Sequence, residues 1–516
     1  MTLHAVALIA PSLLAAAALL AALRPATPAA TTARTAEAAA LLAGVSGIVA
    51  LIVLLLLGPG TAGFITAGLS VRVDALAVTM ALLVCFVGWV VLRYSRTYLR
   101  GEDGQPRFTA LICATIASVL LFVQAGGLML LVAAWIATSL FLHQLLIFYS
   151  DRVPARRAAY KKSVMARISD VALIAAALLL ATTFGTGDIA AILAGAAGAE
   201  ATPQITGAAA LLALAAVLKS AQFPFHGWLT EVMETPTPVS ALLHAGVINA
   251  GGFLLIRFAD VLVQAPGVLA LLVLIGGGTA LLAGLVMLTQ PAVKTSLAWS
   301  TVAQMGFMIL QCGFALFPLA LLHIVAHSLY KAHAFLSSGT AVEAVTANRR
   351  PGPVAVPGAG AVALAFAVAL SIYAVVATLF GLGGKSPQML ALGAILIFGV
   401  AYLLAQGFAD RAPVQLTRRT TFYALTASLS YFALQTGAAA VWGPALPVTP
   451  APGLLEWMLM TLALVSFGAV AVAQSMFAHW AGSPAFAGLR VHIANGFYAN
   501  ALTDRLLNTR SLRKFS

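Results

Sequence analysis

The sequence predicts an all-α membrane protein, a bundle of about fifteen transmembrane helices, and two observations lead to this prediction. Of the 516 residues, 61% are hydrophobic and only 8% are charged, whereas a soluble domain carries roughly 25% charged residues. Apolar runs of roughly 17–25 residues, long enough to cross a hydrocarbon core, recur along the whole chain. The chain has too few polar groups to cover a water-exposed surface, so we expect it to lie in a bilayer.

Each predicted helix is an apolar segment bounded by charged or turn-forming residues, and its boundaries carry an error of roughly 2–4 residues. The first segment lacks the basic residues that open a cleaved signal peptide, so it is interpreted as a membrane span. The fifteen segments cover residues 3–23, 38–57, 73–92, 108–124, 127–149, 166–184, 204–222, 238–259, 267–288, 294–312, 316–343, 355–380, 389–408, 420–441 and 454–478.

Basic residues divide unevenly between the two ends of the predicted bundle. The connections after odd-numbered segments, together with the C-terminal tail, hold 23 of the 28 Lys and Arg residues. The other side holds only Arg72 and Lys385, while Lys219, Arg257 and Lys331 fall within segments. Positive residues concentrate on the cytoplasmic side of a membrane protein. We therefore predict a bacterial inner-membrane protein with a periplasmic N-terminus and a cytoplasmic C-terminus. The net charge of +13 then indicates topology and not nucleic-acid binding.

Nothing in the chain marks a catalytic domain or a resident cofactor. No Walker motif and no Ser/His/Asp arrangement stands out, and no polar segment is long enough to hold an enzyme. The cysteines Cys85, Cys113 and Cys312 lie singly in apolar runs and form neither a CxxC motif nor a disulfide framework. We expect a transport or energy-coupling subunit without cofactor or metal.

Lys219 is an ionisable residue near the end of the seventh apolar segment. The sequence AQFPFHGW follows it, and Pro224 removes a backbone donor and breaks the helix. Broken helices at membrane depth line protein or water cavities in transporters, and a buried lysine there can gain and lose a proton. The alternative is a lysine whose ammonium reaches the membrane interface.

Histidines and a further lysine follow on two later segments. His244 lies about two turns into its segment, and His323, His327 and Lys331 are spaced four residues apart on one helix face. Histidine titrates near neutral pH and suits a proton relay. An HxxxH pair can also bind zinc, but no acidic or cysteine third ligand is near. The other alternative is hydrogen bonding between helices. We predict a proton path and no metal site.

Three further polar residues are candidates for the same path. Arg167 and Asp170 lie three residues apart at the start of their segment. They form either part of the path or a structural i,i+3 pair at a helix N-terminus. His143 lies inside the fifth segment.

The stretch LKSAQFPFHGWLTEVMETPTPVSALLHAG (218–246) resembles the signature of the antiporter-like subunits of respiratory complex I and of Mrp cation/proton antiporters. The resemblance covers about residues 70–345 and includes YLRGEDGQPRF, AVKTSLAWSTVAQMGFMIL and HIVAHSLYKAHAFLSSGT. It implies two inverted five-helix repeats, each with a broken helix. The implied organisation is three helices in 1–107, repeats in 108–260 and 261–410, two helices in 411–480 and a cytoplasmic amphipathic tail in 481–516.

The resemblance also implies roles for the polar residues. Lys219 matches the central lysine of the first broken helix, and His244 matches the relay histidine one helix later. His323, His327 and Lys331 match a polar axis that leads towards the second half. Arg167 and Asp170 match the pair at the start of the sixth helix.

The sequence departs from the family pattern at three places. Ile136 follows Trp135 where the family usually has glutamate, so the expected charge partner of Lys219 is missing, and His143 is considered as its substitute. The second half offers only Lys385, near the outer end, in place of a buried lysine on its broken helix. A long lateral helix after the last segment is not expected either.

These departures fit best the membrane subunits of the two-component DAB inorganic-carbon accumulation complexes. WIATSLFLHQLLIFY (135–149) and HIANGFYANALTDRL (492–506) resemble that branch. The resemblance implies a cation-conducting subunit, with the proton as the expected ion, that drives CO2 hydration to bicarbonate. The hydration would occur on a large, peripheral, zinc-dependent, carbonic-anhydrase-like partner on the cytoplasmic side. Alternatives are a proton-pumping subunit of a complex I-type oxidoreductase, an Mrp-type antiporter, or a structural anchor with an inactive channel.

Overall fold

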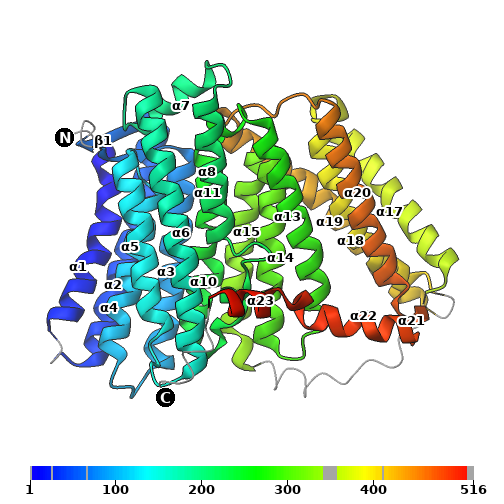
Figure 1. The fold of residues 1–516 in the computed structure, drawn as a ribbon, viewed down its shortest axis with the longest axis horizontal. Coiled ribbons are helices and arrows are strands. Elements are labelled where there is room, and N and C mark those ends of the chain that lie inside the picture. Colours follow the sequence, from blue (N-terminus) through cyan, green and yellow to red (C-terminus); the bar gives the residue numbers. More distant parts are fainter. Residues whose placement is uncertain are drawn as a thin grey trace.

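The protein is a bundle of long helices in two parts, shown by a computed structural model (Figure 1). The structure describes residues 3–24, 27–64, 68–340, 357–409, 412–480 and 482–507. Six of the basic residues counted above, Arg349, Arg350, Arg411, Arg510, Arg513 and Lys514, lie outside these ranges.

The first part begins with six long helices, and one of them, α3 (Ala75–Tyr98), starts at a capping carboxylate, Asp74. Its carboxylate accepts a hydrogen bond from the backbone N of Ala77 at 2.8 Å and so caps a helix. The helices are α1 (Ile9–Leu23, preceded by η1, Leu3–Leu8), α2 (Ala29–Leu57), α3 (Ala75–Tyr98), α4 (Gln105–Val123), α5 (Leu128–Leu146) and α6 (Val153–Phe184).

A small β-hairpin joins α2 to α3, in a region where only helices and loops were predicted. Strands β1 (Gly60–Phe64) and β2 (Leu69–Val73) pair antiparallel, with Gly60 opposite Val73. The backbone N of Arg72 donates to Gln124 O at 2.7 Å, which holds the hairpin against the end of α4. The hairpin lies at the end of the bundle opposite the C-terminal helices (Figure 1).

Two helices at the centre of the bundle are interrupted. As predicted, α8 (Pro203–Lys219) stops at Lys219, and an irregular segment leads to α9 (Gly227–Thr230). The next predicted segment is also divided, because α10 (Thr237–Ala245) and α11 (Ala250–Arg257) are separated by η3 (Val247–Asn249). Short elements complete this region: α7 (Ile189–Ala197), η2 (Val232–Glu234) and α12 (Ala259–Leu262).

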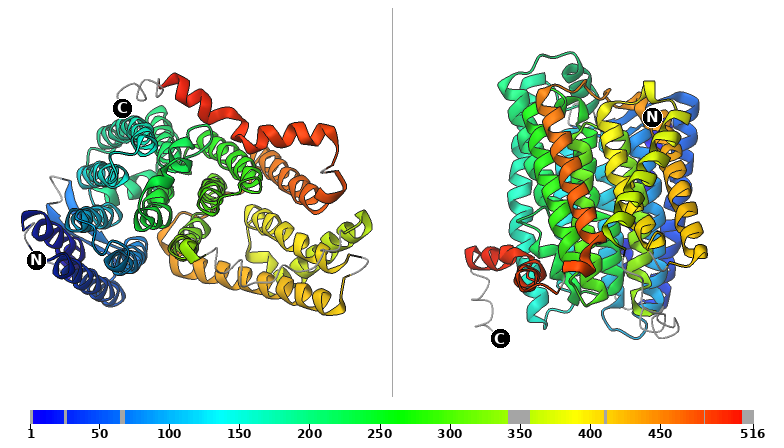
Figure 2. Two further views of the ribbon diagram at one scale, coloured as in Figure 1. Left: turned by 90° about the horizontal axis from the view of Figure 1, so that it is seen from below. Right: turned by 90° about the vertical axis from the view of Figure 1, so that its right-hand side faces the viewer.

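The second part extends the bundle sideways (Figure 2). Its helices are α13 (Pro266–Met287), α14 (Val293–Gly313), α15 (Phe317–Leu336, followed by η4, Ser338–Thr340), α17 (Ala359–Leu379), η5 (Leu382–Gly384), α18 (Pro387–Gly407), α19 (Val414–Trp442), η6 (Gly443–Ala445) and α20 (Leu454–Ser475). The chain then returns across one end of the bundle as α21 (Phe477–Trp480), α22 (Pro484–Ala494), η7 (Gly496–Tyr498) and α23 (Ala499–Leu506). We refer to that end as the tail end.

The helices have the length and composition of membrane spans. Among the described residues, 12 helices are long and apolar enough to cross a membrane, and α8 is a shorter apolar helix. A helix lies over each of the fifteen predicted segments. The number of crossings, the inverted repeats and the domain boundaries remain predictions.

The start of α6 corrects the sequence analysis. The helix begins at Val153, whereas the predicted segment began at residue 166. Lys161 and Lys162, which were assigned to a basic loop, therefore lie inside the helix and are buried. The charges before residue 166 were assigned to the loop that precedes the helix, because a run of charges usually lies in solvent. Their partners come from distant parts of the chain and cannot be read from the local sequence.

Candidate functional site

Lys219 is buried at the point where α8 breaks. Its Nζ lies 4.2 Å from the ring centroid of Trp135 on α5, a cation–π contact. Nζ has no hydrogen-bond partner among the described residues. The turn beyond it includes Ala221 at a φ of +49°. The break therefore holds an ammonium in a protein interior with an aromatic face and no hydrogen-bond acceptor.

Asp170 on α6 is the carboxylate that interacts electrostatically with Lys219. Arg167 Nη2 lies 2.8 Å from Asp170 Oδ2. Neither oxygen of Asp170 accepts a well-directed hydrogen bond from the described residues, although the Trp135 indole faces the same carboxylate. The predicted pair of Arg167 and Asp170 is thus present, on the helix that packs against α8.

Lys162 is a second buried lysine in this cluster, and it was not among the predicted site residues. Its Nζ donates to Ser139 O at 2.5 Å and to Ser139 Oγ at 2.9 Å. The charge of Lys219 acts on Lys162, and the charge of Lys162 acts on His143, which is half-buried. His143 interacts with Lys162 and Arg167, so the structure places it beside α6 and not as the direct partner of Lys219.

A small cavity connects this cluster to the second broken helix. Lys162 and Lys219 line it together with Val247 and Ile248, which lie in the break between α10 and α11. Ser220 Oγ donates to Ile248 O at 3.1 Å and fastens the two breaks to each other. Apolar side chains thus lie between Lys219 and the histidine cluster described next.

His244 on α10 has a defined hydrogen-bonding state. The Thr301 hydroxyl donates its hydrogen to Leu297 O at 3.0 Å, so it accepts from His244 Nδ1 at 3.1 Å. Neutral His244 therefore carries its hydrogen on Nδ1. Its Nε2 is buried and without a partner among the described residues, while the ring stacks on Phe335 at 4.2 Å. Nε2 is a free proton acceptor inside the protein.

The predicted stripe on α15 runs past the same point. His327 Nε2 lies 3.2 Å from His244 O, an oxygen that can only accept, so Nε2 of His327 carries hydrogen. His323 stacks on His327 with ring centroids 6.0 Å apart, and Lys331 Nζ donates to Leu297 O at 3.0 Å. The structure therefore brings together the four residues that the spacing placed on two helices.

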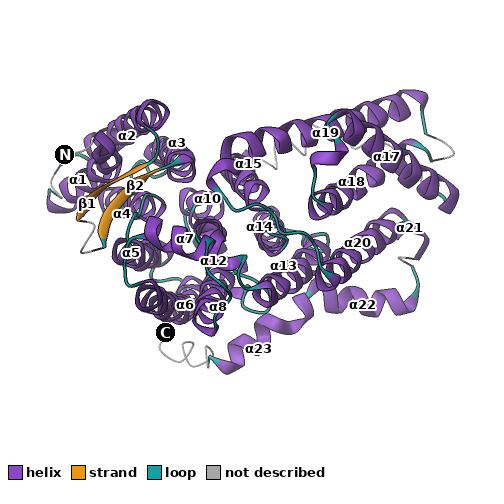
Figure 3. Ribbon diagram, turned by 90° about the horizontal axis from the view of Figure 1, so that it is seen from above, coloured by secondary structure: helices purple, strands orange, loops and turns teal. Residues whose placement is uncertain are grey.

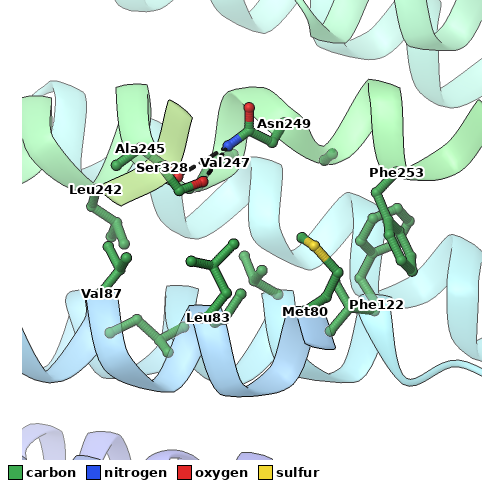
Figure 4. Close-up of a pocket in the computed structure, with 16 residues that line it drawn as sticks. Met80, Leu83, Val87, Phe122, Leu242, Ala245, Val247, Asn249, Phe253 and Ser328 are labelled. Atoms are coloured by element: carbon green, nitrogen blue, oxygen red, sulfur yellow. Dashed lines mark hydrogen bonds between the residues drawn. The ribbon is translucent and has the colours of Figure 1, made fainter. Parts of the chain in front are cut away.

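The second break lines a small apolar cavity of about 30 Å³ between α3, α4, α10 and α11. A Cβ at Gly246 would lie 2.8 Å from Leu242 O, so the break requires glycine there. Asn249 Nδ2 donates to Ser328 Oγ at 2.9 Å and to Ala245 O at 3.0 Å, and this pair forms one wall (Figure 4). Apolar side chains such as Leu83 and Phe122 form the rest of the wall (Figure 4).

A charged network lies below these clusters at the tail end. Lys161 Nζ on α6 contacts Glu231 Oε2 at 2.8 Å and also Asp504 of α23. Arg157 Nη2 lies 3.0 Å from Glu231 Oε1, and Asn500 of α23 donates to the same oxygen. Glu231 follows the break after Lys219 by a few residues. The network therefore ties the C-terminal helix to the broken helix, through residues that the sequence analysis missed.

Comparisons with known proteins decide the family. Residues 125–351 match the family described as NADH:quinone oxidoreductase/Mrp antiporter, and residues 61–109 match complex I chain 5 N-terminus. The Probable inorganic carbon transporter subunit DabB2 of Halothiobacillus neapolitanus is 40% identical over 472 residues, 88% of this chain and 83% of that protein. The chain belongs to the DabB family of inorganic carbon transporter subunits. This family lies within the complex I and Mrp antiporter-like superfamily.

Other DabB and complex I proteins match over a shorter range. The Probable inorganic carbon transporter subunit DabB of Hydrogenovibrio crunogenus is 45% identical over 285 residues, 55% of each chain. NADH-quinone oxidoreductase subunit L of Escherichia coli is 36% identical over 285 residues, 55% of this chain and 46% of that protein. These two matches span about half the length of each relative.

Two solved structures share the fold. The Mrp complex of Dietzia sp. contains a chain with a TM-score of 0.58 and 24% identity, which covers all of this chain and 59% of its own. The archaeal membrane-bound sulfane sulfur reductase gives a TM-score of 0.57 at 15% identity over 96% of this chain and 99% of its own. Both confirm an antiporter-like fold.

Proposed function

We propose that this chain is a cation-conducting membrane subunit, with the proton as the ion, that couples an ion gradient to CO2 hydration and bicarbonate accumulation. The hydration chemistry would belong to a peripheral, carbonic-anhydrase-like partner that holds zinc, and this chain would be non-catalytic. Support comes from the DabB family, whose members here are named inorganic carbon transporter subunits.

One observation carries the conduction part of the proposal. Lys219 is buried at a helix break, where its Nζ has no hydrogen-bond partner among the described residues and faces Trp135. Burying a charge without a hydrogen-bonded partner is costly, so the neutral and charged states of such a group lie close in free energy. Lys219 can therefore load and unload a proton.

The remaining polar residues extend a path from Lys219. Asp170 would stabilise the charged state of Lys219, and the free Nε2 of His244 would accept the proton on the far side of Val247 and Ile248. From His244 the route continues to His327 and His323 on α15. Water entering between the two breaks would bridge the apolar gap and allow proton transfer, and exclusion of this water would interrupt the transfer.

Orientation follows from the distribution of charge. The tail end holds the basic residues of α6 and the C-terminal helices, so it would face the cytoplasm, and the N-terminus would face the periplasm. The partner would bind at the tail end, where hydration of CO2 would deliver bicarbonate into the cell.

Lys219→Ala tests the proposal. In cells that depend on this complex for inorganic carbon, we expect bicarbonate accumulation to fall at least about tenfold, since no other group at the α8 break would carry the proton. Arg419→Ala, at an exposed position of α19, is the control, with equal membrane abundance verified for both variants. Unchanged accumulation in Lys219→Ala would instead indicate a structural anchor.

A further inference from the structure

Asp74 forms ion pairs with two arginines, Arg72 and Arg257, at the end of the bundle opposite the tail end. Its Oδ2 lies 2.7 Å from Arg72 Nε and 2.5 Å from Arg257 Nη1, and its Oδ1 caps α3. One carboxylate therefore faces two guanidinium groups. Arg72 Nη1 is left with no hydrogen-bond partner among the described residues. The cluster offers one unused donor and an excess of positive charge, which suits an anionic group.

The Arg72 side chain lines an open cavity of about 510 Å³ together with its partner Asp74. Asp260 of α12 lies on the wall of the same cavity. The other lining residues are apolar or proline residues, among them Pro59, Pro444 and Leu446. Because Asp74 is paired with Arg72 and Arg257, Arg72 and Asp260 are the two charged groups of opposite sign that remain at this opening.

An apolar groove of about 630 Å³ continues from this opening along α3. Leu54, Ala75 and Val441 line both the opening and the groove. Helices α2 and α3 form one side, and α15 and α19 form the other (Figure 3). The only polar lining residue, Thr79, accepts a hydrogen bond from Trp442 Nε1 at 3.0 Å, so the groove offers no free polar group.

The length of the groove matches one leaflet of a bilayer. It follows α3 from Ala75 to Phe86, about 16 Å at 1.5 Å per residue. The hydrocarbon core of a bilayer is roughly 30 Å thick, so one leaflet contributes about 15 Å. Phe86, Leu329 and Val441 are exposed along the groove, so it opens to the surroundings of the bundle. A polar mouth and an apolar channel of this length together have the form of a phospholipid.

We propose that the opening and the groove bind one phosphatidylethanolamine molecule, with its phosphate on Arg72 Nη1, its ammonium towards Asp260 and an acyl chain in the groove. The lipid fills the space between α2–α3 and α15–α19 and so braces the two parts of the bundle. This inference does not depend on the proposed ion conduction.

Native mass spectrometry tests the site. The full chain is transferred from vesicles of equal phosphatidylethanolamine and phosphatidylglycerol content into mild detergent. We expect one retained phosphatidylethanolamine per chain. Arg72→Gln should lower the retained fraction at least about fivefold, because a charge-assisted hydrogen bond to phosphate is lost. Asp260→Asn should remove the preference for phosphatidylethanolamine over phosphatidylglycerol.

A second variant tests the site independently, in case Arg72→Gln does not fold. Val441→Trp fills the groove at a position that is 61% exposed, and Val465→Trp on α20, at 64% exposure, is the matched control. Of these two tryptophan variants, we expect only Val441→Trp to lose the lipid, and we expect no displacement of the lipid by inorganic phosphate. Retention that is equal in wild type, Arg72→Gln and Val441→Trp would overturn the proposal. Displacement by phosphate alone would overturn it as well, since the site would then bind a free anion.

Discussion

At the residue scale, the partner of Lys219 is the feature that the sequence left open. The lysine itself was predictable, because the proline that breaks the helix lies five residues after it. Its neighbour was not, because Asp170 acts electrostatically on Lys219 only once α6 packs on α8, and no local pattern encodes that packing.

This arrangement predicts unequal effects at Asp170 and His143. Asp170→Asn removes the negative charge that acts on Lys219, so we expect bicarbonate accumulation to fall at least about tenfold. His143→Ala should reduce it less than about threefold, because His143 contacts the α6 side of the cluster and not Lys219. Uptake of labelled inorganic carbon at matched protein abundance measures both. A larger loss in His143→Ala than in Asp170→Asn would contradict this assignment.

Lys161 and Lys162 show why part of the site could not be predicted. Both follow Arg156 and Arg157, and such a run of charges is typical of a solvated loop. Lys162 is instead solvated by Ser139 on α5, and Lys161 by Glu231 and Asp504. The last of these acceptors lies more than 300 residues away in sequence, so only the folded chain shows that the lysines are buried.

At the element scale, helix positions were largely predictable and helix interruptions only partly so. The break after Lys219 has a proline, which the sequence displays. The break between α10 and α11 has only Gly246, and a glycine inside an apolar run is common in membrane helices. The hairpin between α2 and α3 was missed because its strands are short and are held by contacts with the end of α4.

The docking of α23 is the element whose energetics can be tested. Asp504→Asn weakens one of the two acidic contacts of the buried Lys161 ammonium, so we expect a loss of roughly 1–3 kcal/mol in the free energy of unfolding. Glu231 still faces Lys161, which keeps the loss below that of a fully unpaired charge. In Asp504→Asn, this loss of stability would appear as faster hydrogen exchange over residues 499–506 and a lower thermal midpoint in detergent.

Arg152→Ala provides the control for that measurement. Arg152 pairs with Glu234 at 3.1 Å, but both side chains are exposed, so the pair contributes less than about 1 kcal/mol. Hydrogen exchange of α23 should stay at the wild-type rate in this variant. If Asp504→Asn and Arg152→Ala change the exchange of α23 equally, the network around Lys161 does not hold the helix.

At the scale of the whole molecule, the candidate site lies where the first part of the bundle meets α15. Lys219, His244 and His327 lie on three elements that approach one another at the two helix breaks, and Lys161, next to Lys162 on α6, contacts α23 at the tail end. In the second part, Lys385 donates to Gln435 at 2.9 Å, in the connection between α17 and α18 and away from that site. The path proposed above therefore takes its described residues from the first part and from α15.

The proposed binding of a peripheral partner at the tail end leads to a prediction for the assembly. A tag on this chain should co-purify a large peripheral subunit that contains about one zinc per partner chain, measured by metal analysis of the complex. The described part of this chain holds no group of three or more metal-ligating side chains. The Lys219→Ala variant should co-purify the same amount of partner, because Lys219 is buried away from the surface. Recovery of a set of quinone-reducing redox subunits instead would contradict the coupling proposed here and would support a pump of the complex I type.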